Sequence, residues 1–295
     1  MAFGLLSFFF LPRTPTSSPF LSEKEKEAIH AALEQDWTPD SEEEAFSWGQ
    51  VVAAFKTPHV SLCHYLANLI YWYTPLHQVL ILSATFFFCG NMLFSLAYFI
   101  PTIIRDLGYS PVSTQLMSVP PYATTFVCSI GIAILSDRWG QRGYSVLLSG
   151  ILAMIGYMVF LTSTSTPVLY GSIFLQTMGV FTSAPAIGTW NVNNVQPHYK
   201  RSTATALTLA SANCGGILST WIFDDPPRFR KAAKINLAFS FGVCMLAVIN
   251  RVWLMGQNKK KEAERAKRKP LRSAEEEEAE RRRLGDDHPN FIYTL

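Results

Sequence analysis

Long apolar runs, interrupted by only three short charged groups, set the strongest limit on what this chain can fold into. Between residues 81 and 222, the formally charged side chains are Arg105, Asp106, Asp137, Arg138, Arg142, Lys200 and Arg201. A helix crosses the hydrocarbon core of a bilayer with about 20 apolar residues, and the runs between the groups reach that length. Charged residues make up 16% of the whole sequence, against roughly 25% in soluble domains. The sequence therefore predicts a membrane protein with several spans.

Six membrane-spanning helices are predicted, each bounded by a short polar loop. Their expected ranges are 79–104, 115–136, 144–162, 168–190, 203–223 and 235–253. Basic residues concentrate in short cytoplasmic loops, which assigns the loops at 137–142 and 198–201 and the basic tail to the cytoplasmic side. The loop at 224–234 falls on the opposite side although it carries four basic residues, and it is an exception to the rule.

The rest of the chain is organised around the six-span region, residues 79–255. Residues 1–11 are apolar but too short to span a bilayer, and we expect them to be the end of a truncated helix that begins upstream. Residues 12–60 are expected to form a polar cytoplasmic connector. Residues 256–295 carry blocks of acidic and basic side chains, which are typical of a solvated, charged cytoplasmic tail.

Residues 61–78, which we call the misfit segment, are apolar and meet the first span without a polar break. Tyrosine and tryptophan are frequent there, which favours a helix lying at the membrane interface. An additional span is a second interpretation. The third interpretation is a translated intron. The codons for Val60 and Ser61 can contain a sequence like a splice donor site, and the codon for Gln78 can be CAG, which is like the end of a splice acceptor site. Removal of residues 60–78 would join the connector directly to the first span.

The loop sequence LSDRWGQRG, residues 135–143, concentrates charge between two apolar runs. Charge is costly inside a bilayer and tolerated at its edge, so we expect Asp137, Arg138 and Arg142 at the cytoplasmic surface, paired with each other or with helix ends. Gly140 permits a sharp turn. One interpretation is a basic anchor with no conformational role. The other is a gate, which holds one conformation of the protein and then releases it.

This loop resembles the D-R-x-G-R-R/K core of the signature loop of the major facilitator superfamily, with Ala133 in place of the leading glycine and Gln141 in place of a common basic residue. The segments AYFIPTIIRDLGYSP, GTWNVNNVQPHYKRSTATAL, ANCGGILSTWIF and LGDDHPNFIYTL extend the resemblance. Together they are similar to the carboxyl-terminal half of a fungal allantoate permease-like transporter of the anion:cation symporter family. The resemblance runs from about Phe20 to the end, apart from the misfit segment.

The resemblance implies an all-α membrane protein: a six-helix half of a twelve-span transporter, built from two inverted three-helix repeats. It implies proton-coupled transport of small organic anions, such as allantoate, ureidosuccinate, nicotinate or other vitamin-like carboxylates, by alternating access at the plasma membrane. The implied partners are the lipid bilayer and the missing amino-terminal half, not nucleic acid. With this resemblance, the gate becomes the favoured interpretation for Asp137, Arg138, Gly140 and Arg142.

Polar side chains within or next to the spans are candidates for the substrate path, because an amide in hydrocarbon needs a partner or a cavity. These candidates are Asn91, Asn191, Asn194, Asn213 and Tyr122. The alternative is helix packing, or, for Asn191 and Asn194, helix capping and turn formation. Gly90, Gly215 and Gly216 are expected to allow close helix packing.

No catalytic, cofactor or metal site is predicted. The histidines lack a paired nucleophile or metal-ligand spacing, and the five cysteines sit singly in apolar surroundings, as packing residues do. No charge or histidine is expected mid-span between residues 81 and 223. A cation that binds a carboxylate, or an acid that carries a proton, would therefore come from the missing half. The rival interpretation is a non-transporting membrane protein, either truncated or regulating a full-length transporter.

Overall fold

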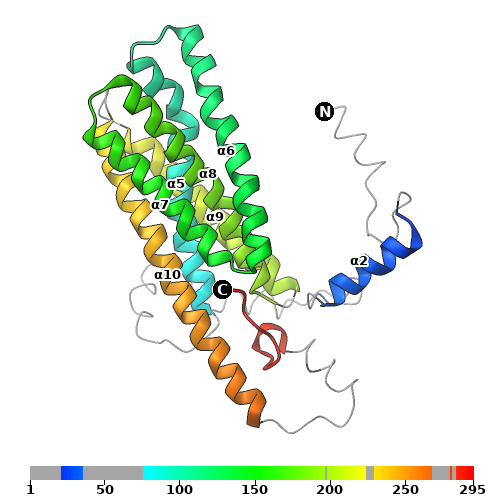
Figure 1. The fold of residues 1–295 in the computed structure, drawn as a ribbon. Helices are drawn as coiled ribbons and strands as arrows, with labels where there is room; N and C mark the ends of the chain where they lie inside the picture. Colours follow the sequence, from blue (N-terminus) through cyan, green and yellow to red (C-terminus); the bar gives the residue numbers. More distant parts are fainter. Residues whose placement is uncertain (1–20, 36–75, 197, 224–228, 268–279, 281–283) are drawn as a thin grey trace. The chain divides into compact units, whose positions relative to one another are not determined.

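The structure is a computed structural model that describes residues 21–35, 76–196, 198–223, 229–267, 280 and 284–295 (Figure 1). The chain divides into two compact units, residues 1–47 and 48–295, and each is described by itself. The predictions for residues 1–11 and for most of the misfit segment, residues 61–75, lie outside the described residues.

The described helix of the first unit is α2 (Glu23–Gln35), which begins with a capping box. The Glu25 backbone N–H donates to the Ser22 hydroxyl at 3.4 Å, and the Glu25 carboxylate accepts from the Ser22 N–H at 2.9 Å. These bonds satisfy backbone donors that the first turn of a helix leaves free. The bond from the Ser22 backbone, followed by the bond from its hydroxyl, lowers the pKa of the Glu25 carboxyl.

The described part of the second unit is built from six long helices. They are α5 (Leu76–Asp106), α6 (Pro111–Trp139), α7 (Arg142–Thr162), α8 (Thr166–Asn193), α9 (His198–Ile222) and α10 (Arg230–Lys267). Each overlaps one of the six predicted spans. By length and composition, α5, α6, α7 and α10 can each cross a membrane. The fold is therefore that of an all-α, multi-pass integral membrane protein, as predicted.

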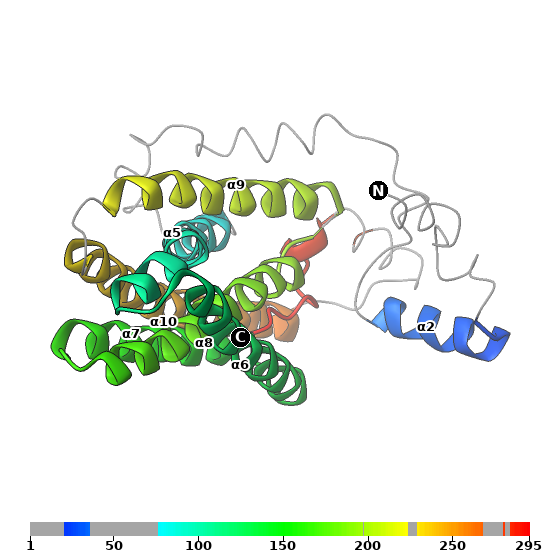
Figure 2. The same cartoon turned by 90° about the horizontal axis from the view of Figure 1, so that it is seen from above.

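The helices of the second unit pack around α5, which contacts α6, α8, α9 and α10. The most extensive contacts are those between α5 and α9 and between α7 and α8, while α6 packs mainly on α8. Viewed from above, α9 and α7 lie on opposite sides of the bundle, with α5 next to α9 (Figure 2). The arrangement leaves much of α6 without a protein neighbour among the described residues.

Small residues bring α5 and α9 into close contact. A Cβ atom added to Gly215 of α9 would collide with the backbone of Phe87 and Asn91 on α5. A Cβ atom on Gly90 of α5 would collide with the backbone of Ala212 on α9. Close approach of this kind is the main source of helix association in a bilayer, where apolar side chains gain nothing by leaving lipid.

A tyrosine hydroxyl of α8 supplies one of the hydrogen bonds that prolines remove from α6. Pro120 and Pro121 lie inside this helix and leave carbonyls of the preceding turn without their usual donors. The Met117 carbonyl, four residues before Pro121, accepts from the Tyr170 hydroxyl of α8 at 2.9 Å. The bond from the Tyr170 hydroxyl takes the place of water, which hydrocarbon excludes.

The close α5–α9 contact predicts that Gly215→Ala destabilises the bundle. We expect the free energy of unfolding to fall by about 1–3 kcal/mol, because the new methyl group overpacks a rigid backbone contact. Gly131→Ala in α6 is the matched control, since its added Cβ meets nothing within 4 Å and alanine favours helix. Thermal unfolding of both variants in detergent checks this, and equal midpoints would contradict the packing account.

Candidate functional site

The connection between α6 and α7 is a tight turn. Gly140 ends α6 with φ +61°, in the left-handed region, and its N–H donates to the Asp137 carbonyl at 3.3 Å. Gln141 then leads directly into α7, which begins at Arg142. Glycine occupies the left-handed region without the strain that a side chain would add. The turn therefore holds Asp137, at the end of α6, close to the start of α7.

Arg142 and Asp137 form an ion pair across this turn. Arg142 Nη1 also donates to the Ser136 hydroxyl at 3.4 Å. The Arg142 side chain is 20% exposed and the Asp137 side chain 63% exposed, so water reaches the carboxylate. A pair of this kind contributes about 0–1 kcal/mol, little enough to break and re-form in a conformational change. Arg138 is exposed, and the structure shows no ion pair between it and another described residue.

Arg251 of α10 joins the turn to a third helix, a contact that the sequence did not predict. Its Nη2 atom donates to the Gln141 side-chain oxygen at 2.9 Å. Its guanidinium carbon lies 4.0 Å from the centroid of the Tyr144 ring, a cation–π contact worth about 0.5–1 kcal/mol at an exposed site. The only sign of this contact in the sequence is that Arg251 is a single arginine near the end of a predicted span. That position does not indicate that Gln141 and Tyr144 are its partners.

A cavity of about 100 Å³ lies beside this turn, between α6, α7 and α8. It is lined by Ser129, Ile132, Ala133, Ser136, Arg142, Ser145, Thr182, Pro185, Ala186 and Thr189. The Thr182 hydroxyl is buried and has no hydrogen-bond partner among the described residues. A cavity of this size holds a few water molecules or part of a small anion. A complete site for an organic nutrient would need further surface.

Asn91 lies between two helices in the interior of the bundle. Its amide nitrogen donates to the Asn236 side-chain oxygen of α10 at 2.8 Å, and both residues are almost completely buried. The Asn91 oxygen has no partner among the described residues. The structure thus places Asn91 in an interhelical contact. The sequence analysis missed Asn236, although a single amide in an apolar run was a visible signal.

Asn191 and Asn194 lie at the end of α8 and are buried. The Asn191 amide nitrogen lies 3.4 Å from the Thr208 hydroxyl of α9. Asn194 ends the helix, and its amide nitrogen donates to the Trp190 carbonyl at 3.1 Å and to the Thr294 carbonyl at 2.9 Å. Asn194 is therefore occupied by contacts within the protein.

The two remaining path candidates, Asn213 and Tyr122, are more exposed. Asn213 lies on an exposed face of α9, and its amide nitrogen donates to the Leu209 carbonyl at 3.0 Å. Tyr122 of α6 is half-buried and meets the Phe181 ring edge to face, with ring centroids 5.4 Å apart. Gly216 is buried and faces a phenylalanine ring of α5. The path candidates are therefore spread over several helices and do not converge on one pocket.

Among the described residues, no group of three His, Cys, Asp or Glu side chains is placed to hold a metal ion. What the geometry offers instead is a charged turn that joins α6, α7 and α10, with a small cavity beside it. The ion pair in this turn is reached by water and is therefore weak.

Comparison with known families agrees with this arrangement. The family described as Major Facilitator Superfamily matches residues 1–220 and 80–283. The two matches cover most of the chain, so the chain belongs to the major facilitator superfamily, a family of membrane transport proteins rather than enzymes.

Similar proteins from fungi are known. An uncharacterized transporter of Schizosaccharomyces pombe is 30% identical over 260 residues, which are 88% of this chain and 48% of that protein. The high-affinity nicotinic acid transporter of Saccharomyces cerevisiae is 28% identical over 267 residues, 89% of this chain and 46% of that protein. A major facilitator-type transporter of Emericella nidulans is 26% identical over 271 residues, 90% of this chain and 50% of that protein. The chain spans about half the length of the curated relatives it matches.

The buried amide pair predicts that Asn91→Leu is destabilising. We expect a loss of about 1–3 kcal/mol, because Asn236 keeps a buried amide without its partner. The double variant N91L/N236L should recover most of this loss, since it removes both polar groups. Thermal unfolding in detergent gives the comparison, with Asn213→Leu as an exposed control. An equal loss in the single and double variants would show that the pair does not matter.

Proposed function

We propose that this chain is the carboxyl-terminal half of a twelve-span permease, which carries a small organic anion with protons across the membrane by alternating access. The observation that carries the proposal is the combination of a family match with a six-helix fold and about half the length of the relatives. In transporters built from repeats, the substrate site lies near the bilayer midplane between the repeats. One half then supplies one wall of the site.

The exposed amide of Asn213 on α9 supports the proposal that another protein surface packs against this helix. Asn213 lies well inside the helix and is exposed, as are the large apolar residues Ile217 and Trp221 on the same helix. Apolar side chains can face lipid, whereas an amide facing hydrocarbon is costly. The side chain of Asn213 therefore needs another protein surface or a water-filled path. In the proposed permease, this face of α9 lies toward the amino-terminal half.

The proposed substrate is a small carboxylate of the allantoate or vitamin type, and the proposed location is the plasma membrane. One of the relatives is named as a high-affinity nicotinic acid transporter, which supports the substrate class. Between residues 81 and 222, every charged side chain lies at or near a helix end. The cation that binds the carboxylate and the acid that carries the proton are therefore contributed by the amino-terminal half.

We assign the cytoplasmic gate to the turn between α6 and α7. The Asp137–Arg142 pair is weak and reached by water, so it can open during the transport cycle. Arg251 ties the same turn to α10 through Gln141 and Tyr144. Opening of the gate thus changes the contact of α10 with this turn and with α7, and Gly140 provides the turn on which this geometry depends.

The proposal predicts that the 295-residue chain does not transport alone. Purified into liposomes, it should show no uptake of labelled nicotinate or allantoate above empty liposomes. Co-reconstitution with an amino-terminal half, taken from the Schizosaccharomyces pombe relative, should produce uptake driven by a proton gradient. Uptake by the chain alone would contradict its assignment as a half.

The gate predicts that Asp137→Asn and Arg142→Gln slow uptake in the completed transporter. Loss of a pair worth about 1 kcal/mol shifts the gate equilibrium about fivefold. Asp106→Asn is the matched control, because Asp106 also pairs with a neighbouring arginine, at 3.4 Å, but lies at the other end of the bundle. Rates are normalised to the amount of protein in the membrane. A similar loss in all three variants would argue against the gate.

A non-transporting membrane protein that regulates a full-length transporter is the second candidate. It predicts no uptake even after an amino-terminal half is supplied, together with co-purification of the chain with an intact twelve-span transporter.

A further inference from the structure

Helix α10 is too long to lie wholly within a membrane. Its 38 residues correspond to a length of about 57 Å, against about 30 Å for the hydrocarbon core. Apolar sequence ends at Met255, and the polar sequence GQNKKKEAERAK follows. Residues 256–267 therefore extend beyond the bilayer, and their lysines and arginine assign this extension to the cytoplasmic side.

Residues 285–295, which we call the terminal clasp, pack against the helix ends on this side. The clasp begins with a short 3-10 turn, Gly285–Asp287. Asp286, His288, Phe291 and Tyr293 in the clasp are buried. The sequence analysis interpreted this region as part of a solvated tail. The clasp is not solvated in this way, because its backbone and side chains form hydrogen bonds with residues of four helices.

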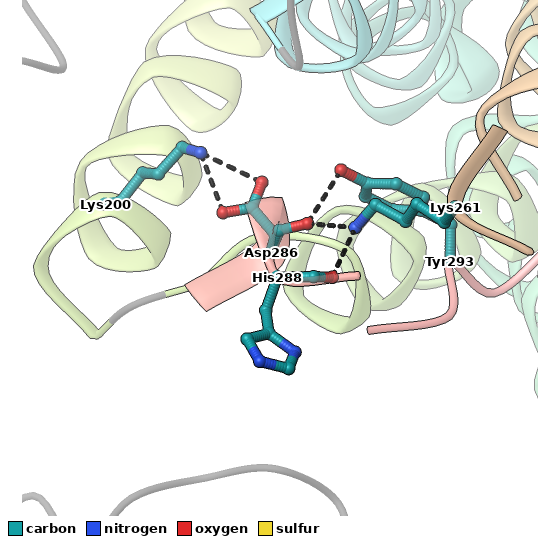
Figure 3. Close-up of polar contacts among 5 residues, drawn as sticks. All are labelled: Lys200, Lys261, Asp286, His288 and Tyr293. Atoms are coloured by element: carbon teal, nitrogen blue, oxygen red, sulfur yellow. Dashed lines mark hydrogen bonds and ion pairs between the residues drawn. The ribbon is translucent and has the colours of Figure 1, made fainter. Parts of the chain in front are cut away.

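Asp286 connects the clasp to the start of α9. Its carboxylate accepts two hydrogen bonds from the Lys200 ammonium, at 2.7 and 2.9 Å (Figure 3). The Asp286 side chain is only 3% exposed. Burial raises the pKa of Asp286, and the positive charge of Lys200 opposes that rise. Loss of the cation would leave a buried carboxylate poorly compensated, which is strongly unfavourable.

Lys261 connects the same point of the clasp to the extension of α10. Its ammonium donates to the Asp286 carbonyl and, at 3.2 Å, to the His288 carbonyl. The Tyr293 hydroxyl donates to the Asp286 carbonyl at 3.0 Å. Figure 3 shows Lys200 and Lys261 approaching Asp286 from different sides. Burial lowers the pKa of Lys261 to about 8, although the charge of Asp286 acts in the opposite direction.

The end of the clasp is held by side-chain amides that bond to its backbone. Asn258 of the α10 extension accepts from the Tyr293 N–H and donates to the Tyr293 carbonyl, both at 2.9 Å. Asn194 does the same for Thr294, accepting at 2.7 Å and donating at 2.9 Å. The Trp190 indole N–H also donates to the Thr294 carbonyl, at 2.9 Å. These bonds recognise the extended backbone of the clasp.

We propose that the terminal clasp is a positioning element that fixes the cytoplasmic ends of α7, α8, α9 and α10 relative to one another. Direct contact between α9 and α10 is slight, so Asp286, bridging Lys200 and Lys261, supplies a link that the two helices lack. The Gly143 N–H, at the start of α7, donates to the Leu295 carbonyl at 3.1 Å. With its helix ends fixed, this half turns as one body in the transport cycle, a consequence that rests on the proposed function.

Distances between spin labels test whether the clasp fixes the helix ends. Labels are placed at exposed positions, Ser202 at the start of α9 and Lys259 in the α10 extension, in the full chain with its other cysteines replaced. Asp286→Asn should broaden the distance distribution and shift it to longer values. Asp287→Asn is the matched control, because this neighbouring carboxylate is exposed and should leave the distribution unchanged.

A second pair of variants keeps the test decisive if D286N does not fold. Lys261→Met removes the buried ammonium, whereas Lys260→Met changes an exposed neighbour. The double variant K200M/D286N removes both charges of the Lys200–Asp286 pair, so that neither of the two is left buried without the other. Distributions that are unchanged in D286N, K261M and the double variant would overturn the proposal.

Uptake by the completed transporter tests the rigid-body role. D286N should lower the maximal rate per molecule and leave KM unchanged, while D287N should alter neither. A normal rate in a variant with broadened distances would overturn the rigid-body role. Absence of uptake in the unsubstituted protein would count against the proposed function instead, and the label distances would still decide whether the clasp fixes the helix ends.

Discussion

Hydrocarbon offers no hydrogen-bond partner, and the packing of this chain depends on polar groups that are satisfied across helix contacts. Pro121 cannot donate a backbone hydrogen bond to the Met117 carbonyl, which instead accepts from the Tyr170 hydroxyl of another helix. The Asn91 side-chain amide donates to the side-chain oxygen of Asn236. Because such partners come from different helices, they also fix how the helices pack. These two pairs show how polar groups in the interior are satisfied by a second helix.

Charge follows the same constraint and gathers at helix ends, where other charges and backbone carbonyls serve as partners. The described contacts place the Asp137–Arg142 turn and the Lys200–Asp286 pair at helix ends. Helix α10 takes part in both clusters, through Arg251 at the turn and Lys261 at the clasp. A movement of α10 would therefore change the contacts of the proposed gate and of the clasp together. Under the proposal, this shared helix is a physical route that couples opening of the gate to the position of the helix ends.

Much of the fold can be predicted from sequence because it rests on local patterns. Apolar length identifies the six spans, and a glycine after Asp137 and Arg138 identifies the turn between α6 and α7. The clasp is different, since Asn194 and Thr294 lie 100 residues apart in the chain. The composition of residues 256–295, which include the clasp, shows only that this part of the chain is polar. Polarity alone does not indicate that the side chains and backbone of the clasp bind buried groups on other helices.

The candidate site was predictable to the same degree. The sequence placed Asp137 and Arg142 on one turn, where the structure shows them paired. It did not foresee that Arg251 contacts this turn or that Asn194 is occupied by the clasp. Asn213 is exposed among the described residues, and the protein surface proposed to pack against it belongs to the amino-terminal half. Pairings between distant elements depend on the three-dimensional arrangement, which a single sequence does not encode in any local pattern.

Complete sequencing of the transcript, from its 5′ end through the codons for residues 60–78, tests the central claim most directly. We predict that the message encodes six further spans upstream of Met1, in the same frame and joined to the connector. The same reads decide whether the misfit segment is a translated intron. A message that begins at Met1, with no upstream spans, would contradict the assignment of this chain as the second half of a single-chain permease.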